Sequence, residues 1–302
     1  MTIVVVIKIR AFHINVKTLL LITLFQWYES IYGKWVLKPY VIGISFIGQN
    51  QTFNVWWDDD SSRFVQISKQ EMNCPIFLAG FIYWHYITSL LHGLFVLSIE
   101  RIFACVFIAN YEKKSRPALL FSLITMFFTL PTITTLISYH NIYPFLQSFS
   151  ICFFSNVLAI IILILTFQYN NKLLERFMRI GNSTKYTLAS RFQARENRRT
   201  FRLLFNFLIA AFFLVFTSLI LVLLMVFEIT PNYHLTYNYL LENIIHLYPL
   251  IVCPVIITSV DRYLMFFKKA FNINRRKTVP MKVRNSVGET DLYFSQLKMS
   301  WK

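Results

Sequence analysis

Glu242 and His246 are the residues of this sequence that come closest to a catalytic or metal-binding pair. On a helix they lie one turn apart and on one face, so they could bind a metal if other helices supplied further ligands. Catalysis would need several such groups to converge, and we favour the alternative, a polar pair that lines a cavity. We therefore expect no catalytic residue, no metal and no cofactor, and we do not expect an enzyme.

His85 and His92 are seven residues apart, so on a helix they share one face. They could line a ligand pocket in the outer half of a helix bundle together with four further residues, Trp84, Tyr86, Glu242 and His246. The alternative for each residue is ordinary packing and hydrogen bonding between helices. We expect His85 and Glu242 to face the bundle interior, because ionisable groups in a bilayer turn toward protein or water.

An acidic and a basic residue, Glu100 and Arg101, follow a long run of residues without charge. Such a pair can hold a helix end closed by bonding to a neighbouring helix, and it can open as a switch. The simpler alternative is that Arg101 extends to the phosphate headgroups. From physical chemistry alone we favour this alternative.

A strongly basic segment, residues 168–202, contains nine of the 30 lysines and arginines. Few helix breakers follow Gly181, so Leu188–Arg202 could continue the next apolar segment as a helix into the cytosol. Such a helix would contact anionic lipid or an acidic partner protein.

The cysteines show no spacing typical of a zinc site; they are Cys74, Cys105, Cys152 and Cys253. Cys74 could form a disulfide with Cys152 in an oxidising compartment. We favour the alternative that Cys152 lies within a helix.

The elements that must position these residues are apolar segments of membrane length. Of the 302 residues, 56% are hydrophobic and only 15% are charged, and no charged residue occurs from Pro117 to Asn171. A soluble surface is not built from such a stretch, whereas a bilayer core about 30 Å thick requires segments of roughly 20 apolar residues. We predict an all-α, polytopic membrane helix bundle with six complete spans, Thr18–Tyr32, Ile76–Ile99, Ala118–Ile137, Phe149–Phe167, Leu203–Phe227 and Tyr239–Val260.

The distribution of basic residues predicts how these spans are oriented. Lysine and arginine total 26 on one side of the predicted spans, in residues 1–17, 100–117, 168–202 and 261–302. They total four on the other side, in residues 33–74, 138–148 and 228–238. Basic loops stay in the cytosol, so the first set, with the C-terminus, is predicted to be cytoplasmic. The net charge of +16 thus reflects membrane orientation rather than binding of nucleic acid.

Two features at the beginning of the chain bear on this topology. Asn50 begins a sequon for N-glycosylation in the loop that we place outside, so it is a candidate glycosylation site. The apolar segment Met1–Ile9 ends in basic residues and resembles the cytoplasmic end of a truncated first span. The alternative is an anchor that lies on the membrane surface.

Several short motifs occur in an order that matches a known family. They are Phe12-His13-Ile14-Asn15, Leu24-Phe25-Gln26-Trp27-Tyr28-Glu29, Trp84-His85-Tyr86, Glu100-Arg101-Ile102-Phe103-Ala104, Tyr111-Glu112-Lys113-Lys114-Ser115-Arg116-Pro117, and Arg191-Phe192-Gln193 with Glu196-Asn197. As an ordered set they resemble the nematode serpentine chemoreceptors of class epsilon (Sre), a branch of the seven-transmembrane G-protein-coupled receptors. The resemblance covers nearly the whole chain.

The resemblance implies a chemosensory receptor that detects an external small molecule or peptide and signals to a heterotrimeric G protein. It implies a GPCR-like bundle in contact with membrane lipid, in the plasma or ciliary membrane of sensory neurons. Glu100 and Arg101 would form the switch, although Ile102 stands where such receptors usually carry an aromatic residue. The G-protein-facing surface would include four arginines, Arg191, Arg195, Arg198 and Arg199.

The competing hypothesis is a membrane transporter or channel without G-protein coupling. Transporters tend to show internal repeats, Gly-rich discontinuous helices and intramembrane charges. This sequence has no internal repeat, no discontinuous pair of Gly-rich helices and few intramembrane charges. We therefore expect residues 1–302 to form one receptor-like domain whose final part, residues 271–302, is a disordered cytoplasmic tail.

Overall fold

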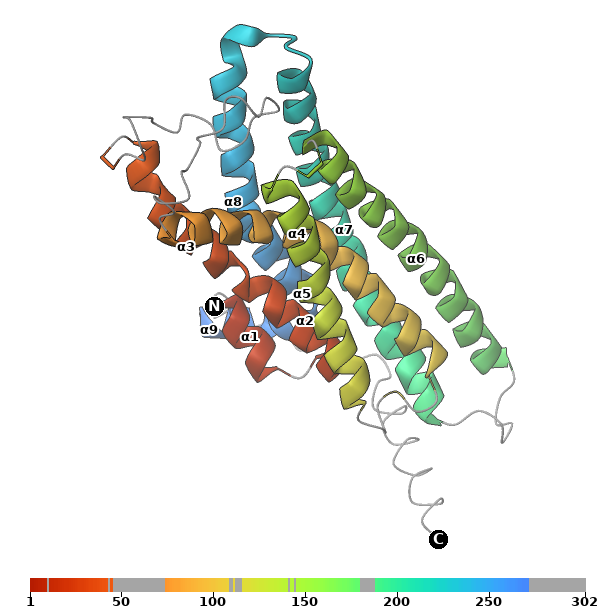
Figure 1. Ribbon diagram of the computed structural model, residues 1–302. Coiled ribbons are helices and arrows are strands. Elements are labelled where there is room, and N and C mark those ends of the chain that lie inside the picture. Colours follow the sequence, from red (N-terminus) through yellow and green to blue (C-terminus); the bar gives the residue numbers. More distant parts are fainter. Residues whose placement is uncertain are drawn as a thin grey trace. The chain divides into compact units, whose positions relative to one another are not determined.

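The protein is described by a computed structural model (Figure 1). The residues that it describes are 1–9, 11–42, 44–45, 74–108, 111, 116–140, 142–143, 145–179 and 188–271. The helices among them are α1 (Thr2–Lys8), α2 (Ile14–Phe25), α3 (Trp27–Val41), α4 (Cys74–Val106), α5 (Pro117–Tyr139), α6 (Phe145–Arg179), α7 (Leu188–Val226), α8 (His234–Ser259) and α9 (Asp261–Ala270), with a 3₁₀ turn at Pro231–Tyr233.

Five of these helices, α4 to α8, are long and apolar enough to cross a membrane. They contain 23 to 39 residues each. At a rise of about 1.5 Å per residue, such a helix covers the roughly 30 Å hydrocarbon core. These helices confirm five of the predicted spans and the all-α class.

The remaining predicted span, Thr18–Tyr32, is divided in the structure between α2 and α3, which meet at Gln26. The two helices have 12 and 15 residues, so neither is as long as a span. Gln26 itself keeps helical backbone angles, but its amide group is buried without a hydrogen-bond partner. The apolar run is too short here because Glu29 and Lys34 follow soon after the junction.

Two helices continue well beyond their apolar segments. α6 extends to Arg179, and α7 begins at Leu188, as the absence of helix breakers after Gly181 predicted. Both extensions lie at the end of α4 that carries Arg101, where Asn170 of α6 donates a hydrogen bond to the Ala194 carbonyl of α7. We name this the Arg101 end of the bundle, and the opposite one the Cys74 end.

α4 lies at the centre of the bundle and contacts α2, α3, α5, α6 and α7 (Figure 1). Its membrane-length segment is 61% buried, against 17% for those of α6 and α7. Gly33 permits the close approach of α3, because a Cβ atom there would lie 3.1 Å from the Cβ of Tyr83. The large apolar side chains that α6 and α7 expose, such as Phe154 and Phe213, are suited to contact lipid.

The helix α1 packs against α2 and α8, with Val5 and Val6 fully buried. The chain divides into two compact units, Met1–Leu264 and Met265–Lys302, and the bundle belongs to the first. Apart from Phe271, the predicted disordered tail lies outside the described residues, as does the candidate glycosylation site Asn50.

Candidate functional site

Glu100 and Arg101 lie inside the protein near the end of α4, with 0% and 2% of their surfaces exposed. The guanidinium of Arg101 donates to Glu100 Oε2 through both Nε and Nη2. A buried charge is tolerated only when it is paired and hydrogen-bonded, and this contact of two nitrogens with one carboxylate oxygen pairs both ions. Arg101 therefore does not extend out to headgroups, contrary to the alternative that physical chemistry alone favoured.

The second carboxylate oxygen of Glu100 connects α4 to α2. The hydroxyl of Tyr111 donates to Glu100 Oε1, and it accepts a hydrogen bond of 2.7 Å from the Asn15 amide. Burial, and next the charge of Glu100, raise the pKa of Tyr111, so the hydroxyl keeps the proton that it donates. His13 packs on the Tyr111 ring and caps α2 by accepting the Asn15 backbone N–H at 3.3 Å.

The guanidinium of Arg101 also connects α4 to α7 and α6. Its Nη1 atom donates to Asn197 Oδ1 of α7 at 3.3 Å. The Asn197 amide donates to Asn170 Oδ1 of α6 at 3.3 Å and to the Ala104 carbonyl at 3.4 Å. We name the six residues of this network, which ties α2, α4, α6 and α7 together, the polar cluster: Asn15, Glu100, Arg101, Tyr111, Asn170 and Asn197.

A basic face of α7 lies beside the polar cluster. Arg195, Arg198 and Arg199 are exposed, and together with Arg202 and Leu174 of α6 they line a recess of about 380 Å³. Arg199 pairs with Glu196 at 3.6 Å. Arg191 lies on the same helix, but its side chain is outside the described residues.

At the Cys74 end, two predicted pocket residues bond to α3. His85 is buried and its Nδ1 lies 2.8 Å from Glu29 Oε2, whereas Glu242 is half-exposed and pairs with Lys34 at 3.3 Å. Among the described residues, no three histidines, cysteines or acidic residues are grouped as a metal site would need.

The other two predicted histidines are separated from His85 and from each other. His246 bonds through its two nitrogens to Ser30 and to the Tyr83 hydroxyl, and Tyr86 stacks on its ring. His92 bonds to Thr134 of α5 at 3.0 Å and to Ser155 of α6 at 3.2 Å. His85 and His92 thus bond to different neighbours, because seven residues separate them by about 10 Å along the helix. That they line one ligand pocket stays a prediction.

Cys152 lies within α6 as a free, buried thiol, 3.7 Å from His92 Nε2. This position agrees with the alternative that we favoured, in which Cys152 lies within a helix. A free thiol at Cys152 does not support the candidate disulfide with Cys74, whose own side chain is outside the described residues.

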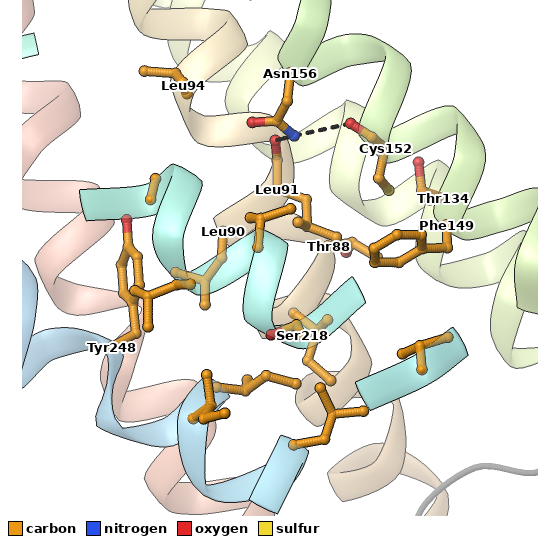
Figure 2. A pocket seen from close by; sticks show the side chains of 18 of the residues that line it. Thr88, Leu90, Leu91, Leu94, Thr134, Phe149, Cys152, Asn156, Ser218 and Tyr248 are labelled. Carbon is orange, nitrogen blue, oxygen red and sulfur yellow. Dashed lines mark hydrogen bonds between the residues drawn. The ribbon is translucent and has the colours of Figure 1, made fainter. Parts of the chain in front are cut away.

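A cavity of about 100 Å³ lies between α4, α5, α6, α7 and α8 (Figure 2). Of the six predicted pocket residues, only Trp84 lines it. Much of the wall consists of one face of α7, formed by Ala211, Leu214, Val215, Ser218 and Val222. The sequence did not predict this face, because α7 is apolar on all sides here. The spacing of its apolar residues therefore does not distinguish the side that faces the cavity from the side that faces lipid.

A multi-pass helical membrane bundle with a cavity between its helices and a buried acid–arginine cluster at one end has the architecture of a serpentine receptor. The family model of the Sre G protein-coupled chemoreceptors matches residues 1–302, and the chain belongs to this family.

Similar proteins from Caenorhabditis elegans agree with this assignment. Serpentine receptor class epsilon-45 is 32% identical over 314 residues, which cover 98% of this chain and 85% of that protein. Serpentine receptor class epsilon-38 is 30% identical over 318 residues, with 98% and 86% covered. No solved structure gives a significant match. The protein is thus a chemosensory G-protein-coupled receptor of the membrane, not an enzyme.

Proposed function

We propose that the polar cluster holds this receptor in its inactive state and that opening of the cluster lets a heterotrimeric G protein bind. The observation that carries the proposal is the complete burial of Glu100 and Arg101 among groups from four helices. Buried charges in such a network are costly unless every partner is present. The loss of one partner therefore favours an arrangement in which Arg101 can reach water or an incoming protein.

We infer that the Arg101 end faces the cytosol. The support is the distribution of lysine and arginine, of which 26 lie on this side and four on the other. The G-protein-facing surface then includes Arg195, Arg198 and Arg199, and Arg191 on the same helix. The Cys74 end faces outside and detects the external chemical, a small molecule or peptide, in the plasma or ciliary membrane of sensory neurons.

The two ends are joined by α4 and α7, which carry both the cluster and the cavity. Trp84 and Leu94 of α4 and Ala211 of α7 line the cavity, while Arg101 and Asn197 meet about two to five turns away. A ligand that binds better when these helices are apart would shift the population toward the open cluster. We propose this shift as the route of signalling.

The test is basal and ligand-driven activation of Gα subunits from the main classes, in cell membranes and at equal surface expression. We expect Glu100→Gln to raise basal activity several-fold, because it leaves the buried Arg101 without its counter-charge. We expect Arg101→Ala to abolish coupling.

An exposed acid–arginine pair on α6 at the same end, Glu175 and Arg176, provides the matched control. Glu175→Gln and Arg176→Ala make the same chemical changes outside the cluster and should leave activity as in the wild type. Wild-type signalling by Arg101→Ala at equal surface expression would contradict the proposal.

A further inference from the structure

The cavity between helices α4 to α8 has a wall without charged side chains. Among the described residues that line it, none is an aspartate, glutamate, lysine, arginine or histidine. Figure 2 shows the side chains that surround it, among them Leu90, Leu91 and Leu94 of α4, Phe149 of α6 and Tyr248 of α8. An ion placed here would lose its hydration without gaining a counter-charge, so the wall selects against charged ligands.

The ionisable residues nearest in sequence do not line the cavity themselves, although His92 bonds to two residues that do, Thr134 and Cys152. His85 and Glu242 bond to Glu29 and Lys34 of α3. His92 is held between Thr134 and Ser155. The polar residues that the sequence singled out therefore support the bundle rather than the cavity.

Most polar groups of the wall already have partners. Thr88 bonds to Thr135 at 2.7 Å, and Thr134 to the Leu130 carbonyl at 3.0 Å. The amide of Asn156 donates to the carbonyls of Leu91 and Cys152 at 2.7 and 2.9 Å, as Figure 2 shows. These groups have little hydrogen-bonding capacity left for a ligand.

Three hydroxyls of the wall, those of Ser148, Ser218 and Tyr248, have no hydrogen-bond partner among the described residues, and of these only that of Ser148 is fully buried. Ser148 lines the cavity, it is only 4% exposed, and its hydroxyl is buried without a hydrogen-bond partner. A buried polar group without a partner costs free energy, which a ligand would recover by bonding to it. The hydroxyl oxygen is covered in this structure, so Ser148 reaches a ligand only if it rotates about its Cα–Cβ bond to another staggered rotamer.

We propose that this cavity is the ligand site and that it takes a neutral, largely apolar molecule with one hydrogen-bonding oxygen, which Ser148 binds. The size follows from the volume, since an apolar cavity of about 150 Å³ holds a benzene molecule. This cavity has about two thirds of that volume, so a small ring of about the size of a substituted benzene fits only when α4 and α7 move apart, as the proposed function requires of the ligand. This inference rests on the proposed function, because it identifies the chemical that the receptor detects.

The test uses four fluorinated probes that share one ring and differ in one group: 4-fluorophenol, 4-fluorotoluene, 4-fluorobenzoate and 4-fluorobenzylammonium. Fluorine NMR measures their binding to the full chain in lipid nanodiscs at pH 7. Wild-type protein should bind the two neutral probes with a Kd of about 1 mM or tighter, in the range that small ligands reach. It should not bind the two charged probes in the cavity.

Two matched variants distinguish binding of a probe in the cavity from its partitioning into the lipid. Ala211→Phe places a phenyl ring in the cavity and should abolish binding of the neutral probes. Ala210→Phe makes the same change at the adjacent position, which does not line the cavity, and should bind them as the wild type does. Ser148→Ala should weaken 4-fluorophenol by about two- to tenfold, the loss of one hydrogen bond, and leave 4-fluorotoluene unchanged.

The proposal is overturned if Ala211→Phe binds the neutral probes like the wild type. It is equally overturned if the charged probes bind as tightly, if no neutral probe binds at about 10 mM, or if Ser148→Ala affects neither probe. This readout needs no G protein, so its failure is distinguishable from failure of the switch. Should Arg101→Ala couple normally while the neutral probes bind in the cavity, only the switch would be wrong.

Discussion

The guanidinium of Arg101 in α4 donates a hydrogen bond to Asn197 Oδ1 in α7 across 3.3 Å. Asn197 makes further bonds to α4 at this end, to the Ala104 carbonyl and to Cys105 Sγ, and it also bonds to Asn170 of α6. Glu100 is bonded within α4 and to Tyr111, so it positions Arg101 rather than holding α7 itself. The restraint on α7 therefore depends on a neutral amide, which can separate from Arg101 without leaving a second charge unpaired.

Asn197→Leu is predicted to raise basal activity. Leucine is close to asparagine in size but cannot accept the hydrogen bond, so the restraint on α7 is lost while the Glu100–Arg101 pair remains. The substitution also removes the bonds that the Asn197 amide donates to α4 and α6. One net hydrogen bond corresponds to about two- to tenfold in the open population, so the increase should be at least of this size. The measurement is basal Gα activation normalised to surface expression.

Asn243→Leu is the control for this prediction, because the exposed Asn243 amide bonds only to the Tyr239 carbonyl of its own helix among the interactions described. Equal basal activity of Asn197→Leu and Asn243→Leu would show that the Arg101–Asn197 bond does not restrain α7.

The sequence predicted the fold more completely than the site. The five long helices and the extension of α7 to Leu188 follow from apolar length and from the absence of helix breakers. The division between α2 and α3 did not follow, because Gln26 keeps helical backbone angles and no proline or glycine marks the junction.

The sequence predicted part of the polar cluster but not the cavity. Glu100 and Arg101 were recognised because they are charges that follow a charge-free run. Asn15 and Asn197 occur in the motifs that carry the family resemblance, but a motif does not show which residues meet across helices. The cavity wall was missed, because Ala211 and Ser218 resemble their lipid-facing neighbours in polarity.

Tyr111→Phe is predicted to destabilise the protein. It removes the hydroxyl that donates to Glu100 and that accepts from Asn15, so two buried polar groups each lose a partner. A hydrogen bond to a charged group contributes about 1.5–3 kcal/mol, so thermal unfolding in nanodiscs should begin at a clearly lower temperature. Tyr233→Phe removes an exposed hydroxyl outside the cluster and should match the wild type. An unchanged unfolding temperature for Tyr111→Phe would mean that its bond to Glu100 is not formed.

The predicted topology can be tested with two epitope tags. A tag after Lys302 should bind antibody only after cells are permeabilised, because the distribution of basic residues predicts that this side is cytosolic. A tag between Ile142 and Tyr143, which connects α5 and α6 at the Cys74 end, should bind antibody on intact cells. Labelling in the opposite pattern would reverse the orientation and with it the proposed G-protein surface.

His13 is predicted to make the stability of the protein sensitive to acid. Burial, as the largest cause, lowers the pKa of His13 below its ordinary value of 6.5. The folded protein therefore binds fewer protons at His13 than the unfolded chain does once the pH falls below about 6.5, and stability falls with pH there. Protonation also removes the lone pair with which Nδ1 accepts the Asn15 N–H.

His13→Asn should remove this part of the pH dependence, because asparagine caps a helix without titrating. Unfolding temperatures between pH 5 and pH 8 would be compared in nanodiscs for the wild type, for His13→Asn and for His140→Asn, which replaces an exposed histidine. We expect the wild type and His140→Asn to lose stability in parallel as the pH falls through 6.5, and His13→Asn to lose less. If all three curves are parallel, protonation of His13 does not oppose folding, and the contact between His13 and Tyr111 tolerates a positive charge.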